Sequence, residues 1–87
     1  MTTLTTLDRC RRGDFTNNAA FTRENSKAYN ERNDELRTAF KESLFAEHGI
    51  AHHPKREKLF SLAWANGHAY SFAEVVLHFE DMLELIK

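Results

Sequence analysis

The stretch 70–87, YSFAEVVLHFEDMLELIK, has the clearest helical pattern in the sequence. Ser71 stands where an N-cap residue accepts a backbone hydrogen bond, and Glu74 follows at the position that completes a capping box. Hydrophobic residues then recur at spacings of three and four, which is typical of an amphipathic helix with one buried side. They are Phe72, Val75, Val76, Phe79, Met82, Leu83 and Ile86. The sequence predicts a helix from Phe72 nearly to the end of the chain.

A second helix is predicted between Pro54 and Gly67. Proline suits the first position of a helix, because that residue has no intrahelical N–H partner. Glycine suits the left-handed position just beyond the last turn. The connection to the last helix, NGHAYS, is short, so we expect the two helices to pack antiparallel as a hairpin.

A longer helix is predicted upstream, beginning near Asn18, because no proline or glycine interrupts residues 19–48. Gly49 marks its end, and Ile50 can contact Phe45 in a Schellman cap. Residues 1–16 are expected to form an irregular arm, and residues 17–87 a single helical domain. The predicted fold is all-α with three helices, a long first helix followed by an antiparallel helical hairpin. The arm has three hydrophobic anchors, Leu4, Leu7 and Phe15.

Composition narrows the class of protein further. Eighty-seven residues allow one domain, and a net charge of −1 exerts no global attraction to nucleic acid or to an anionic membrane. The single cysteine, Cys10, forms no internal disulfide, which favours the cytoplasm. No hydrophobic run approaches the roughly 20 residues that span a bilayer. The chain has no Gly-rich phosphate loop, nucleophile elbow or HExxH motif, so we expect a protein that is not an enzyme and needs no cofactor.

Histidines and cations gather at residues 48–58, HGIAHHPKREK. Gly49 and Pro54 break the helical phase between the histidines, so we expect no converging metal ligands there. Cations in the first turn of a helix can hold an anion, since that turn has unpaired N–H groups. Alternatively, acidic residues at the end of the last helix compensate these cations within the chain: Glu80, Asp81 and Glu84. The candidate binding residues are His52, His53, Lys55, Arg56 and Lys58, and none is assigned to a metal.

The long helix carries a thin hydrophobic seam, since Phe21, Ala28, Tyr29 and Leu36 lie roughly a heptad apart. A core this small often needs a further staple, and neither a disulfide nor a metal is predicted to supply it. We therefore expect a homodimer, with Tyr29 as a further candidate binding residue. The alternative is that the N-terminal arm folds back and covers the seam within one chain.

A nucleic-acid-associated protein is the competing hypothesis. Its basic surface would combine the arm with the 52–58 junction, through Arg9, Arg11 and Arg12 on the arm. A helix-turn-helix is disfavoured, because the second helix of that motif enters the major groove. Here the corresponding helix is acidic, and its single lysine or arginine is the terminal Lys87.

Four short segments between residues 53 and 86 form a recognisable pattern. They are His53-Pro54-Lys55, Leu62-Ala63-Trp64, Gly67-His68 and Glu74-Val75. In these segments residues 53–86 resemble small helical proteins of unassigned activity encoded by bacteriophages. The resemblance implies a phage or prophage setting, in which small non-catalytic proteins frequently bind a host protein. The hypothesis is therefore a protein-binding accessory factor in the bacterial cytoplasm that inhibits or modulates a host or defence protein.

Overall fold

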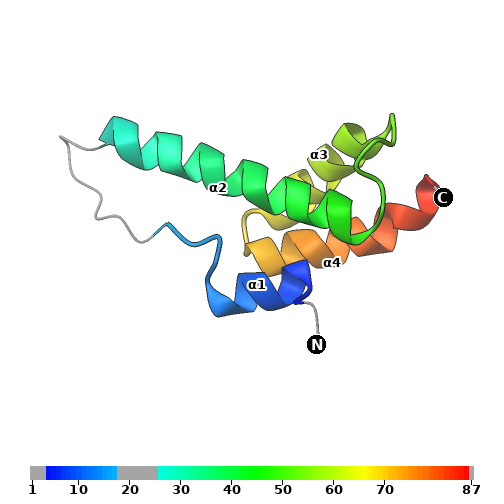
Figure 1. The fold of residues 1–87 in the computed structure, drawn as a ribbon, viewed down its shortest axis with the longest axis horizontal. Coiled ribbons are helices and arrows are strands. Elements are labelled where there is room, and N and C mark those ends of the chain that lie inside the picture. Colours follow the sequence, from blue (N-terminus) through cyan, green and yellow to red (C-terminus); the bar gives the residue numbers. More distant parts are fainter. Residues whose placement is uncertain (1–3, 18–25, 87) are drawn as a thin grey trace.

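The computed structural model describes residues 4–17 and 26–86, which form four α-helices and no strand (Figure 1). The helices are α1 (Thr6–Arg12), α2 (Ser26–Glu47), α3 (Arg56–Gly67) and α4 (Phe72–Met82), and a 3-10 turn, Leu83–Leu85, follows. The predicted all-α class is confirmed, but four helices replace the expected three. None of the helices in the described ranges has the length and apolar character needed to cross a membrane.

Helix α1 lies where an irregular arm was expected. Thr5 caps it by accepting a hydrogen bond from the backbone of Asp8, whose side chain accepts one from the backbone of Thr5 in return. Gly13 ends it with a φ of 90°. Asp14 then accepts hydrogen bonds from Arg9 and Arg12. Local capping thus forms a helix of seven residues, although its sequence has too few hydrophobic positions to show a helical period.

Helix α2 is the long helix of the prediction. Its expected first part, residues 18–25, lies outside the described residues. Its end follows the predicted Schellman cap: Gly49 has a φ of 68°, and the Ile50 N–H donates to the Phe45 carbonyl at 2.9 Å. The side of α2 that faces the core buries Leu36, Phe40, Leu44 and Phe45.

Helices α3 and α4 pack closely against each other, and Gly67 permits this contact. The glycine is the last residue of α3 and is not left-handed, so the role predicted for it is wrong. A Cβ at this position would lie 2.6 Å from the backbone nitrogen of Val75. Helix α3 also begins at Arg56, two residues after Pro54, which lies in the preceding turn. The antiparallel direction of the pair stays a prediction.

The predicted start of α4 is confirmed. Ser71 is its N-cap, and the hydroxyl oxygen accepts a hydrogen bond from the Glu74 N–H at 3.2 Å. Val75, Val76 and Phe79 are fully buried behind it. The α-helix gives way to the 3-10 turn at Leu83, so the helical segment continues nearly to the end as expected.

The core is centred on Phe40, which is fully buried. The ring of Phe72 stacks on it, with centroids 4.7 Å apart, and the rings of Phe15 and Phe60 meet it edge-on. Of the expected anchors, Phe15 is buried and Leu7 packs against the core, but Leu4 is 46% exposed. Residues 4–17 therefore fold back onto α2 and α4.

Substitution of Gly67 tests the close contact of α3 and α4. Alanine normally favours a helix over glycine by about 1 kcal/mol. In Gly67→Ala the added Cβ would press on backbone atoms of α4, so we expect a net loss of about 1–3 kcal/mol in the free energy of unfolding, as in other overpacked sites. Urea melts would measure it. The exposed neighbour Asn66→Ala is the control, with an expected change within about 0.5 kcal/mol. A stabilised Gly67→Ala protein would contradict this packing.

Candidate functional site

The structure places His52, His53 and Lys55 in the connection between α2 and α3, and Arg56 and Lys58 in the first turn of α3. His53 has a structural role there: its Nδ1 accepts a hydrogen bond from the Lys55 N–H, and its Nε2 lies 3.1 Å from the Ile86 carbonyl. These two bonds fit the neutral ring with its hydrogen on Nε2. Arg56 donates to the His53 carbonyl at 2.7 Å. The others, His52, Lys55 and Lys58, are exposed.

The expected charge compensation between the junction and the last helix is not observed. Within residues 4–17 and 26–86, no ion pair joins Lys55, Arg56 or Lys58 to Glu80, Asp81 or Glu84. The ion pair of α3 is made with α2 instead, since the Glu57 carboxylate on α3 lies 3.1 Å from the Lys41 ammonium on α2. The junction therefore borders the hydrophobic C-terminal turn, to which His53 is bonded.

Tyr29 lies in the first turn of α2, at the opposite end of this helix from the junction. Its carbonyl accepts a hydrogen bond from the Asn17 side chain, which also donates to the Asn33 side chain. Leu36, a further residue of the predicted seam, is 5% exposed and belongs to the core. At least this residue of the predicted seam is therefore buried within a single chain, as expected if the seam is covered without a second copy.

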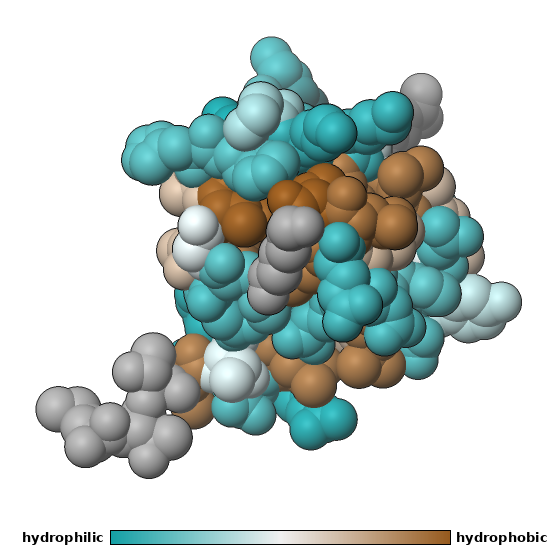
Figure 2. All heavy atoms as spheres, turned by 90° about the vertical axis from the view of Figure 1, so that its right-hand side faces the viewer, coloured by the Kyte–Doolittle hydropathy of each residue, from teal (hydrophilic) through white to brown (hydrophobic). Residues whose placement is uncertain are grey.

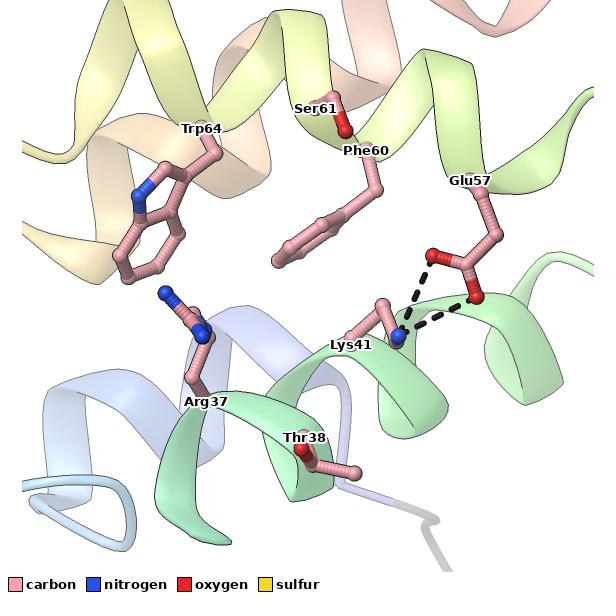
Figure 3. A pocket seen from close by; sticks show the side chains of 7 residues that line it. All are labelled: Arg37, Thr38, Lys41, Glu57, Phe60, Ser61 and Trp64. Carbon is pink, nitrogen blue, oxygen red and sulfur yellow. Dashed lines mark hydrogen bonds and ion pairs between the residues drawn. The ribbon is translucent and has the colours of Figure 1, made fainter. Parts of the chain in front are cut away.

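An open groove between α2 and α3 has the more developed binding geometry, and it contains none of the predicted site residues. It encloses about 290 Å³. Phe60 and Trp64 project into it from α3, and Arg37 and Lys41 line it from α2 (Figure 3). The two cations are four residues apart, so they lie one helical turn from each other on the same side of α2.

Charge and aromatic contacts hold the groove side chains in place. The Arg37 guanidinium lies 5.6 Å from the centre of the Trp64 ring, a cation–π distance, and 3.5 Å from Asp34. The Trp64 ring stacks on His68, with centroids 5.4 Å apart and an angle of 8° between the rings, and contacts Phe72. The groove thus offers an aromatic floor and two cations.

Such a groove can hold a carboxylate beside a hydrophobic side chain. Arginine binds carboxylates through two parallel hydrogen bonds, and lysine adds a second positive charge. Sequence reasoning missed these residues because Arg37 and Lys41 look like an ordinary solvated helix face. The one available signal was their spacing of four, which places both on one side of the predicted long helix.

Nearly the whole chain, including the groove, matches one known protein family. A family model described as a family of unknown function, DUF8546, matches residues 7–87. The chain belongs to the DUF8546 family. No curated protein and no solved structure gives a significant match. The matched range of this DUF8546 chain begins inside α1 and includes every residue that lines the groove.

Cys10, the single thiol of the DUF8546 chain, is half-buried on α1. Burial is the main cause that raises the pKa of this thiol from 9.0 to about 11, against a lowering effect of Arg9. The negative charges of Asp14 and Glu47 raise it further. A thiol attacks only as the thiolate, so Cys10 is suited to packing and not to nucleophilic chemistry.

Alkylation measures this property. At pH 8 roughly one Cys10 in a thousand would be a thiolate, so we expect iodoacetamide to modify the folded protein more than tenfold more slowly than the urea-unfolded protein. Because the folded pKa is the higher one, the difference should shrink as the pH rises toward 11. Mass spectrometry would follow the reaction. Equal rates for folded and unfolded protein at pH 8 would contradict the assignment.

Proposed function

We propose that this DUF8546 chain is a non-catalytic protein-binding accessory factor, and that the groove between α2 and α3 holds an acidic segment of its partner. The observation that carries the proposal is the pair Arg37 and Lys41 beside the aromatic floor of Phe60 and Trp64. Tryptophan and arginine are the residue types that most often dominate the energy of protein interfaces.

The acidic character of the partner follows from the two cations. Each already has an exposed intramolecular acid, Glu57 for Lys41 and Asp34 for Arg37. Such exposed pairs contribute only about 0–1 kcal/mol, so a partner carboxylate can replace them at low cost. The partner segment then needs one hydrophobic side chain that packs on Trp64.

A second surface supports a binding role. Figure 2 shows hydrophobic side chains between polar ones at the end of the molecule that carries the C-terminal turn. Leu85 is 73% exposed in this turn, and Ile86 is partly exposed. Hydrophobic surface with a polar rim is typical of contact sites for other proteins. The junction candidates His52, His53 and Lys55 lie next to it through the bond of His53 to Ile86.

We further propose that the protein is encoded by a bacteriophage and that it inhibits or modulates a host or defence protein in the bacterial cytoplasm. Its support is the resemblance of residues 53–86. The homodimer likewise stays a prediction, with Tyr29 and the exposed Ala28 as the remaining described parts of its seam.

The nucleic-acid hypothesis receives less support. Arg9 and Arg12 both bind Asp14, which reduces the positive charge that α1 presents. Figure 1 also shows α1 and the start of α3 on separate parts of the molecule. The two basic regions therefore do not join into one surface.

Tryptophan fluorescence tests the groove, because Trp64 is the only tryptophan of the chain. The probe is a short peptide of alternating Asp and Phe, with a Lys–Phe peptide of equal length as its control. We expect a saturable change in emission with the acidic peptide and at least tenfold weaker binding of the basic one. Lys41→Glu should weaken the acidic peptide at least tenfold, because a repulsive charge replaces an attractive one. Lys27→Glu, an exposed charge reversal on α2 outside the groove, should leave it within about twofold.

Circular dichroism would show that both variants keep their helix content. Equal responses to the acidic and basic peptides, or equal loss in Lys41→Glu and Lys27→Glu, would refute the proposed groove.

A further inference from the structure

Three side chains that could bind a metal ion converge where α2 ends against α4. Glu47 is the last residue of α2, His48 follows it, and Glu80 comes from α4. One ligand atom from each lies within 4.8 Å of the other two. The His48 Nε2 is 3.0 Å from a Glu47 carboxylate oxygen and 3.4 Å from a Glu80 carboxylate oxygen. None of the three lines the groove between α2 and α3.

The His48 ring nitrogen distinguishes this cluster from an ordinary group of surface carboxylates. Its Nε2 atom is buried and has no hydrogen-bond partner, although two carboxylates lie so close. Both oxygens therefore lie to the side of the direction in which an Nε2–H would point. A buried nitrogen without a hydrogen bond is costly and calls for another partner.

The distances suit a shared metal ion. Zinc binds histidine nitrogen and carboxylate oxygen at about 2.0–2.2 Å, so two ligand atoms of a tetrahedral site lie about 3.3 Å apart. The observed separations of 3.0 and 3.4 Å are close to this edge length. In a tetrahedral site the neighbouring ligands also lie off the axis of the ring nitrogen, because the ion occupies that axis.

Surrounding contacts fix the orientation of the ligands. The other Glu47 carboxylate oxygen accepts a hydrogen bond from the Thr6 N–H, which leaves the oxygen nearest His48 to bind a metal. The Thr6 hydroxyl bonds to Ser43 at 2.7 Å and so ties the start of α1 to α2. The His48 ring lies against Phe79, with centroids 5.8 Å apart. Such outer contacts raise metal affinity by holding each ligand in position.

We propose that Glu47, His48 and Glu80 bind one divalent transition-metal ion, of which zinc is the best match. A nitrogen and two oxygens suit zinc, whereas calcium and magnesium prefer oxygen ligands alone. Three protein ligands leave a fourth position for water. The ion would link the end of α2 to α4, and this site is independent of the proposed function of the groove.

The competing interpretation is a protonated His48 that forms ion pairs with both carboxylates. If His48 is only a protonated partner of the two carboxylates, the protein should bind metal no better than its other histidines do. If the three side chains form a metal site, binding should depend on Glu80. Glu80→Gln is the test variant, because it keeps the size of a partly exposed side chain. Glu84→Gln is the matched control, since Glu84 is exposed on the same C-terminal segment and lies outside the cluster.

Untagged full-length protein, stripped with EDTA, would be titrated with zinc chloride by calorimetry. We expect one ion per chain and a rise in Tm of several degrees at saturating zinc. Glu80→Gln should weaken binding at least tenfold, whereas Glu84→Gln should bind within about twofold of the parent. Absence of binding to the parent, or equal binding by the parent and Glu80→Gln, would overturn the proposal. Cobalt(II) should give the intense visible absorption of a tetrahedral site, and a weak octahedral spectrum would also overturn it.

Discussion

The packing of aromatic rings around Phe40 joins four segments of the chain in one core. The Phe40 ring on α2 contacts Phe72 at 4.7 Å, Phe15 at 5.4 Å and Phe60 at 5.9 Å. Each partner comes from a different part of the chain, so one side chain joins the N-terminal segment, α3 and α4 to α2. A domain of this length buries a smaller fraction of its surface on folding than a larger domain does, and each aromatic pair adds about 0.5–1.5 kcal/mol to the burial itself.

The same rings determine the geometry of the groove. Phe60 contacts Phe40 on its inner side and Trp64 at 5.9 Å, so the groove floor is an extension of the core. Trp64 is further held by Phe72 and His68. Side chains already held in place lose little entropy when a partner binds, which favours the binding that we propose for the groove.

Features governed by local chemistry could be predicted from the sequence. The Ser71 cap, the Schellman cap at Gly49 and the anchor Phe15 depend on short motifs or on one large hydrophobic side chain, and the structure has all three. Helix α1 was missed because its cap uses aspartate where glutamate is the usual signal, and because its hydrophobic residues are few. Gly67 showed the limit of local rules, since a neighbouring helix, and not its own φ, requires the glycine.

The candidate sites depend on contacts between distant segments, so the sequence did not reveal them. Arg37 and Trp64 meet only because α3 packs on α2, and His48 meets Glu80 only because α4 passes the end of α2. The junction histidines drew attention by their number, yet the structure gives His53 a connecting role. Residue type and spacing along one helix cannot show which helix faces it.

If one aromatic cluster around Phe40 joins the four helices, the Phe15 ring must lie against the Phe40 ring in solution. Two-dimensional NMR of protein with labelled phenylalanine rings would measure the nuclear Overhauser effects between these side chains. We expect cross-peaks from Phe15 ring protons to those of both Phe40 and Phe72, since the centroids are 5.4 and 6.3 Å apart. A Phe15 ring with the chemical shifts of a solvent-exposed phenylalanine and no cross-peak to Phe40 would show that the N-terminal segment does not pack on this cluster.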